Sequence, residues 1–249
     1  MVNRVQDVNS KFDQEYFTSE AYADVSFEPY SQYWWSNRYY ANLVKKFGPR
    51  KGLTLEVGCG LGHLLGWLVD RYEVYGTDIN PWALRDACKN VPEGNFLLLS
   101  ADDLTVFPDL TFQAVIAKHV VEHLSKPELA VAEFSRVLAP GGMLLLATPN
   151  TSSIARAVKK MDWIGYQDPT HVSLWSPEQW INTLKLNNLR PRKIYSDGLW
   201  DAPYVSWLPA SFQKVLFGAP GGLQAILGLC LVPLRLGESL IVLAEKDGR

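Results

Sequence analysis

The chain has 249 residues, of which 47% are hydrophobic and 20% charged, and its formal net charge is -2. This length suits a single α/β domain spanning residues 1–249 and leaves little room for a second one. Nucleic-acid binding needs clustered Lys and Arg, so we expect a small-molecule partner and no nucleic acid. The three cysteines, Cys59, Cys88 and Cys230, are far apart. They argue against a disulfide framework or a thiolate zinc site and favour a cytoplasmic location.

Aromatic residues crowd the segment 30–40, which we expect to be a helix within an N-terminal cover at residues 1–50. The first 20 residues are polar and lack the apolar core of a signal peptide. From Leu53 onward, short apolar runs alternate with helix-length segments, which is typical of a parallel sheet flanked by helices. The predicted strands of this cofactor-binding half, residues 51–150, are 53–57, 73–77, 95–99, 114–117 and 143–148.

Helices are predicted between these strands and after them. Asn80 is a favourable N-cap with Pro81 at the first helical position. Beyond residue 148 the rhythm changes, and Ser176 followed by Pro177 opens another helix in the expected substrate half, residues 151–249. The other predicted helices are 62–71, 126–138 (closed by the Ala-Pro-Gly-Gly run at 139–142) and 152–160.

The chain ends with a predicted sixth strand at 192–195, an aromatic and Gly/Pro-rich cap near 199–236, and a last strand at 239–244. Glycine, proline and arginine interrupt the cap, so it does not predict a membrane span. Its aromatic side chains fit either a lid over an apolar substrate or the cap's own core. The basic helix at 152–160 fits an ordinary surface helix, or a peripheral membrane contact.

Together these elements predict a doubly wound, Rossmann-like α/β fold. The sheet has seven mostly parallel strands with an antiparallel last strand. An N-terminal helical cover lies over it, and an apolar cap lies between the sixth and seventh strands.

A glycine-rich turn, Leu-Glu-Val-Gly-Cys-Gly-Leu-Gly at 55–62, follows the first strand. Glycines let backbone N–H groups approach a ligand there, so we predict cofactor contacts from Gly58, Cys59, Gly60 and Gly62. NAD enzymes use a similar turn, but their third glycine usually lies three positions after the second. Here both spacings are two residues.

Acidic residues at two strand ends extend this site. Asp78 lies twenty positions after Gly58, where a carboxylate can accept both ribose hydroxyls, although it could instead be a turn residue. Glu56 lies inside an apolar strand and would need a partner, such as a ligand's ammonium group. The other predicted cofactor contacts are Ile79, Ser100, Ala101, Asp102 and Lys118.

These motifs resemble those of class I S-adenosylmethionine-dependent methyltransferases over roughly residues 30–186. The run 55–62 resembles the first motif, 76–79 (Gly-Thr-Asp-Ile) the second, and Glu122-His123 with the later Pro-Gly-Gly the remaining ones. The resemblance implies S-adenosyl-L-methionine as the cofactor. The chain is most similar to the ubiquinone-biosynthesis O-methyltransferases, in which a Thr-His pair, here Thr170 and His171, precedes a helix start.

In that family an arginine of the N-terminal helix reaches the cofactor's carboxylate, and Arg38 after two tryptophans is the matching candidate. The chain departs from the family at Ser100, where an Asp is frequent, and at His119, where the quinone enzymes tend to have Glu.

If the acceptor is a hydroxyl, methyl transfer needs a base as well as positioning. The candidates are His171 and His123, although either could instead fix a loop through hydrogen bonds. His119, Glu122 and His123 have a spacing that could place three metal ligands on one helical face. We predict no metal, because the segment begins at a strand end and such clusters are usually hydrogen-bonded polar groups.

The sequence therefore predicts a methyltransferase that moves a methyl group to a small molecule. The expected acceptor is a hydroxyl oxygen of an aromatic, quinone, lipid-linked or sugar compound. Two alternatives remain: an NAD-dependent oxidoreductase built on the same βαβ unit, and a non-catalytic module that only binds the cofactor.

Overall fold

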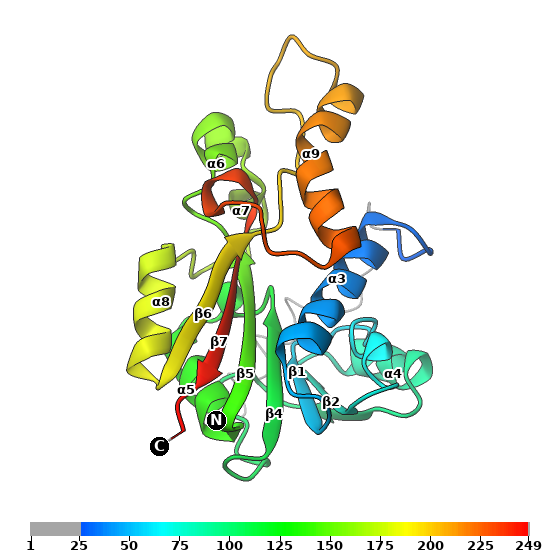
Figure 1. Ribbon diagram of the computed structural model, residues 1–249, viewed down its shortest axis with the longest axis vertical. Coiled ribbons are helices and arrows are strands. Elements are labelled where there is room, and N and C mark those ends of the chain that lie inside the picture. The colour runs from blue at the N-terminus through cyan, green and yellow to red at the C-terminus, as the bar shows by residue number, and fades with distance from the viewer. Residues whose placement is uncertain (1–25, 249) are drawn as a thin grey trace.

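The protein is described here from a computed structural model, which covers residues 26–248. The first half of the expected N-terminal cover, including the segment judged against a signal peptide, lies outside the described residues. A seven-stranded sheet with the order β3-β2-β1-β4-β5-β7-β6 forms the centre of the molecule (Figure 1). Strands β1 to β5 pair in parallel, whereas β7 is antiparallel to both β5 and β6. The predicted fold class is confirmed. The strands are β1 (Leu53–Val57), β2 (Glu73–Asp78), β3 (Asn95–Leu98), β4 (Phe112–Lys118), β5 (Leu138–Pro149), β6 (Leu189–Ser196) and β7 (Ser239–Lys246).

Helices cover both faces of the sheet (Figure 1). Alternate residues of β4 enter two separate cores, because successive side chains of a strand point to opposite faces. Val115 packs with Phe134 and Trp180 on one side, and Ile116 packs with residues of α3 on the other. The α-helices are α3 (Gln32–Phe47), α4 (Pro81–Asn90), α5 (Pro127–Val137), α6 (Ile154–Lys159), α7 (Ile164–Gln167), α8 (Pro177–Leu186) and α9 (Ala210–Leu227). The 3-10 helices are η1 (Leu65–Trp67), η2 (Val121–His123), η3 (Lys160–Asp162) and η4 (Leu234–Leu236).

The helix predicted at 62–71 is wrong. Only the single turn η1 forms there, flanked by turns whose hydrogen bonds mostly span three residues. Gly62 has a left-handed backbone conformation (φ 76°), which a right-handed α-helix cannot include. Gly66 in the middle lowers helix stability by a further ~1 kcal/mol relative to alanine. The segment instead buries Leu64, Leu65 and Leu68 beneath α3.

The predicted apolar cap between the sixth and seventh strands is confirmed as α9 and its flanking loops, which pack against α3. Among the described residues, no helix is long and apolar enough to cross a membrane. The Ala-Pro-Gly-Gly run expected to close α5 instead begins the twelve-residue strand β5.

Candidate active site

A cavity of about 660 Å³ opens at the carboxyl ends of β1, β2 and β4, bordered by the first half of α3. This volume lies within the usual range for small-molecule sites, and parallel sheets bind ligands at this edge. Most of the predicted site residues meet here. Those that line the cavity are Glu56, Gly58, Cys59, Gly60, Asp78, Ile79, Ser100, Ala101, Lys118 and His123.

The glycine loop forms one wall of the cavity. Gly58, Gly60 and Gly62 all have positive φ, at 67°, 50° and 76°. A Cβ on Gly58 would lie 2.3 Å from Cγ2 of Val120, so only glycine fits there. Gly62 lies outside the cavity lining, and its missing Cβ lets the loop pack closely on Ala87 of α4.

Asp78 ends β2 and holds the glycine loop in place. Its Oδ2 accepts a hydrogen bond from the Gly60 N–H at 2.8 Å, and its Oδ1 accepts one from the Asn80 N–H at 2.9 Å. Burial raises the pKa of Asp78, and these backbone donors oppose the rise. Each carboxylate oxygen has a second lone pair, so Asp78 can still accept ligand hydroxyls.

Glu56 and Lys118 bring opposite charges into the cavity from the neighbouring strands β1 and β4. The Lys118 Nζ donates to Oδ1 of Asn37 at 2.7 Å and lies 5.2 Å from the ring centre of Tyr40. Burial raises the pKa of Glu56 and lowers that of Lys118, while the attraction between them opposes both shifts.

Among the described residues, 26–248, two buried polar atoms beside this pair have no hydrogen-bond partner: Oε2 of Glu56 and Nδ2 of Asn37. Leaving such groups unpaired is costly, and the exceptions are concentrated where a ligand completes the bonding. The cavity therefore presents an unused acceptor at Glu56 and unused donors at Asn37 and Lys118, since an ammonium has three donors.

Arg38, predicted to reach the cofactor's carboxylate, does not line the cavity. Its guanidinium carbon lies 5.1–5.7 Å from the ring centres of Trp34, Trp35 and Trp67, in a cage of cation–π contacts. Successive helical residues point about 100° apart, so α3 turns Asn37 to the cavity and Arg38 away. Asp102 also lies outside the lining, where it accepts a hydrogen bond from the Ser100 hydroxyl.

The two predicted catalytic histidines are neighbours, with ring centres 4.8 Å apart, but only His123 lines the cavity. The Thr170 hydroxyl donates its proton to Asp168, because a carboxylate can only accept. The Thr170 oxygen can then accept from Nδ1–H of His123, 2.8 Å away, and the basic lone pair falls on Nε2. His171 lies next to His123 but outside the cavity lining. Its Nδ1 is 2.8 Å from the Gly165 carbonyl oxygen, and its Nε2 is 3.7 Å from Asp168.

His119 lines the cavity, although no catalytic role was predicted for it. It has a left-handed backbone (φ 54°), an uncommon conformation for a non-glycine residue that is often retained at functional sites. Its Nδ1 lies 3.1 Å from Oε1 of the buried Glu122, and its Nε2 lies 3.4 Å from the Ser239 hydroxyl. No sequence signal marks this conformation.

The metal-like spacing of His119, Glu122 and His123 does not produce a shared helical face, because His119 precedes η2. Among the described residues, the ligand atoms that do converge, within 4.8 Å, belong to Glu122, His123 and His171. One carboxylate and two imidazoles could hold a divalent ion. Glu122 and His123 also take part in the hydrogen bonds described above, and we assign no metal to them.

Comparison with known proteins places this geometry in a family. A sequence profile described as a methyltransferase domain matches residues 33–194. The chain belongs to this methyltransferase family. A solved structure of a SAM-dependent methyltransferase from Archaeoglobus fulgidus superposes with a TM-score of 0.59 at 19% identity. That match covers 84% of this chain and 94% of the other.

Two curated methyltransferases match part of the chain. A malonyl-[acyl-carrier protein] O-methyltransferase from Methylococcus capsulatus is 26% identical over 138 residues, which are 53% of this chain and 50% of the relative. A ubiquinone biosynthesis O-methyltransferase from Caulobacter is 30% identical over 152 residues, 57% of this chain and 58% of the relative. The chain thus spans little more than half the length of these relatives.

S-adenosylmethionine is the cofactor of this methyltransferase. The cavity fits it on three counts that come from the chain's own residues. Gly58 and Gly60 of the glycine loop line the cavity beside Asp78, whose carboxylate can accept ribose hydroxyls. The unpaired atoms of Glu56 and Asn37, together with Lys118, match the ammonium and carboxylate of an amino acid.

Proposed function

We propose that this chain transfers a methyl group to a hydroxyl oxygen of a small aromatic, quinone, lipid-linked or sugar acceptor. The observation that carries the proposal is the pairing of a complementary amino-acid site with an oriented histidine in one cavity. The O-methyltransferase relatives support the oxygen acceptor. The free state of Cys59, Cys88 and Cys230 supports a cytoplasmic location.

In this proposal the cavity binds the cofactor at both ends. Asp78 and the glycine loop hold the ribose, and the backbone near Ser100 and Ala101 borders the adenine. At the other end, Oε2 of Glu56 accepts from the ammonium group. Lys118 and Asn37 donate to the carboxylate, in the place that the family resemblance gives to Arg38.

Bound S-adenosylmethionine supplies an activated methyl group on a sulfonium that is already a good leaving group. The chain's remaining tasks are to position the acceptor, exclude water and remove the hydroxyl proton. Nε2 of His123 would take the hydroxyl proton, so that the acceptor oxygen could receive the methyl group while the carbon–sulfur bond breaks and S-adenosylhomocysteine leaves with its electron pair. Burial lowers the pKa of His123, so its imidazole is neutral and able to accept a proton at pH 7. Thr170, Asp168 and His171 position this ring.

His123→Asn is therefore expected to lower kcat about 10²- to 10⁴-fold, the usual contribution of a general base, with nearly unchanged affinity for S-adenosylmethionine. The wild-type rate should be constant around pH 7. It should fall at lower pH, where His123 becomes protonated. Because the pKa of His123 is lowered, this fall should lie below pH 6.5, near which an ordinary histidine titrates. The variant should lose this dependence. The assay follows labelled methyl transfer into cell extract, and mass spectrometry identifies the product as an O-methyl ether or ester.

His171→Asn provides the matched control, because His171 lies outside the cavity lining. It should reduce kcat less than His123→Asn does. If His171→Asn lowered kcat more than His123→Asn does, His171 would be assigned as the general base instead. Label recovered only in N-methyl products or macromolecules would contradict the proposed acceptor while leaving cofactor binding intact.

A further inference from the structure

Helix α9 has its polar and apolar faces reversed. The face buried against the protein carries glutamines and glycines, namely Gln213, Gly218, Gly221 and Gln224. The exposed face carries large apolar side chains spaced three and four residues apart, as on one side of a helix. They are Phe212, Val215, Leu216, Leu223, Ile226 and Leu227.

The inward polar face is fully engaged, so α9 cannot simply roll over to bury its apolar side. The Gln213 amide accepts from the N–H groups of Tyr204 and Val205 and donates to two carbonyl oxygens. The Gln224 amide accepts from the N–H groups of Leu231 and Val232 and donates to the Ser196 carbonyl. These buried bonds fix the orientation of the helix.

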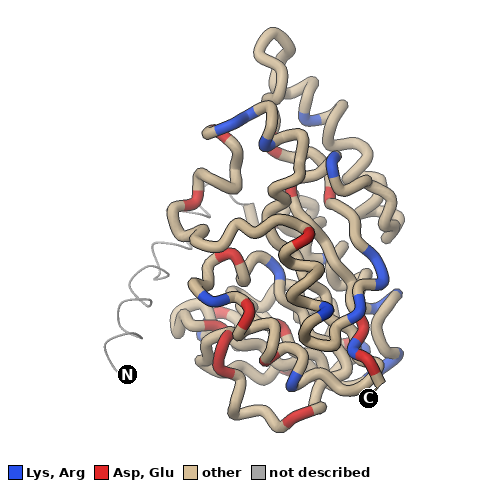
Figure 2. The backbone as a smooth tube through the Cα atoms, turned by 90° about the vertical axis from the view of Figure 1, so that its left-hand side faces the viewer, with Lys and Arg blue, Asp and Glu red and all other residues tan. Residues whose placement is uncertain are grey.

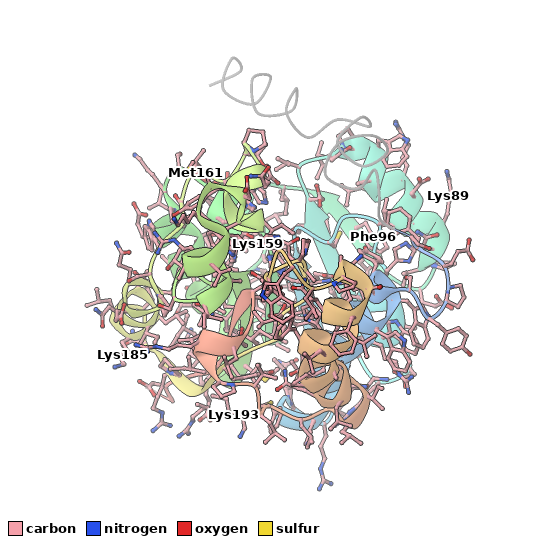
Figure 3. The ribbon with its side chains drawn as sticks, turned by 90° about the horizontal axis from the view of Figure 1, so that it is seen from above. Lys89, Phe96, Lys159, Met161, Lys185 and Lys193 are labelled. Carbon is pink, nitrogen blue, oxygen red and sulfur yellow. The ribbon has the colours of Figure 1, made fainter. Side chains whose placement is uncertain are left out.

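The exposed apolar surface continues beyond the helix. Trp207, in the loop before α9, is 81% exposed, and Leu231 after it is also exposed. Met161 of η3 is also exposed, but Figure 3 shows it across the view from α9, so it is not part of this surface. Exposed apolar side chains on a soluble monomer are normally scattered singly. Their concentration along α9 and its flanking loops therefore indicates an interaction surface.

The charge of the segment indicates what it contacts. No Asp or Glu occurs between residues 202 and 237, whereas Lys214 and Arg235 do, and Figure 2 shows how the two kinds of charge are distributed along the backbone. Asp201, in the loop before α9, is paired with Lys159. Near the other end of the helix, Lys46 donates to the Gly228 carbonyl. Basic residues beside an exposed apolar face suit an anionic lipid surface.

A second copy of the chain fits this surface less well. Two α9 helices face to face would offer Lys214 no acidic partner on the opposing segment. The small residues that allow helices to approach closely lie on the buried face. We propose that α9 and its flanking loops bind flat on the surface of an anionic membrane, with Val215 and Leu223 in the apolar boundary. This proposal does not depend on the identity of the cofactor or the acceptor.

The test is co-sedimentation of the full chain with vesicles, made either of phosphatidylcholine alone or of equal parts phosphatidylcholine and phosphatidylglycerol. Wild-type protein should bind the mixed vesicles more tightly. Combining Val215→Glu with Leu223→Glu should weaken binding about tenfold or more. Each substitution removes an apolar side chain from the membrane boundary and introduces a negative charge that the anionic lipid repels. Leu186→Glu, at an 84% exposed leucine on α8, is the matched control and should bind as wild type does.

Lys214→Gln should weaken binding to the mixed vesicles and leave binding to phosphatidylcholine unchanged. Thermal melting and binding of S-adenosylmethionine by each variant show that the fold is retained. Failure of the wild-type protein to sediment with either vesicle overturns the proposal. A wild-type dimer in sedimentation velocity that the double substitution abolishes, without vesicle binding, overturns it in favour of self-association.

Discussion

Asp78→Ala is expected to weaken S-adenosylmethionine binding by about 1–3 kcal/mol, up to roughly a hundredfold in Kd, through lost charged hydrogen bonds. Two effects add in the same direction. The ribose loses its acceptor, and the Gly60 and Asn80 N–H groups lose the carboxylate that holds the glycine loop. Isothermal titration calorimetry measures the change in affinity.

Asp78→Asn separates the two effects, because the amide keeps one acceptor oxygen. It should bind with intermediate affinity. Burial opposes the charged form of Asp78, as its raised pKa indicates, so neither substitution should greatly destabilise the protein without ligand. Unchanged affinity in Asp78→Ala, with an intact fold by circular dichroism, would remove Asp78 from the site.

Lys118→Met is expected to weaken S-adenosylmethionine binding by about 2–3 kcal/mol and also to lower the stability of the ligand-free protein. Methionine occupies a similar volume, but it leaves the buried Glu56 without its opposite charge. The Oδ1 of Asn37 also loses its donor, and in the bound state the cofactor's carboxylate loses a charged partner. Calorimetry should therefore show weaker binding, and thermal melting should show a lower melting temperature without ligand.

Arg38→Gln is the matched control, because the guanidinium is held among tryptophan rings outside the cavity lining. Its affinity for S-adenosylmethionine should stay within about twofold of wild type. The reverse pattern, in which Arg38→Gln loses binding and Lys118→Met keeps it, would restore the role that the family resemblance gives to Arg38.

The sequence was informative where local chemistry alone decides the structure. Strand β1 has the predicted bounds, and its parallel neighbours follow from apolar runs too short for helices. Asn80 caps α4 as predicted, with its side chain accepting from the N–H groups of Trp82 and Ala83. Ser176 opens α8 with a capping box that includes Gln179. Each of these signals needs only a few neighbouring residues.

Predictions that depend on tertiary geometry fared less well. The sequence places Asn37 and Arg38 side by side, and only the packing of α3 decides which one faces the cavity. The helix expected at 62–71 does not form, because Gly62 has a positive φ and the leucines of the segment are buried in the core without a helix. His119 reaches the cavity through a left-handed backbone that no residue pattern encodes.

The cap shows the same limit in another form. Its aromatic residues fit either a lid or a buried core, yet Trp207 and Phe212 are exposed. The inverted face of α9 arises because Gln213 and Gln224 bond to backbone groups of loops that only the fold brings near. Composition alone favours burial of the cap's aromatic side chains, because it does not show which face of α9 these bonds turn inward.

The central claim is that the cavity recognises both ends of S-adenosylmethionine, and one calorimetric comparison tests it most directly. Wild-type protein is titrated with S-adenosylmethionine, with methylthioadenosine, which lacks the amino-acid end, and with NAD. We expect S-adenosylmethionine to bind about tenfold or more tightly than methylthioadenosine, and NAD not to bind. Equal affinity for the first two, or tight binding of NAD, would contradict the account.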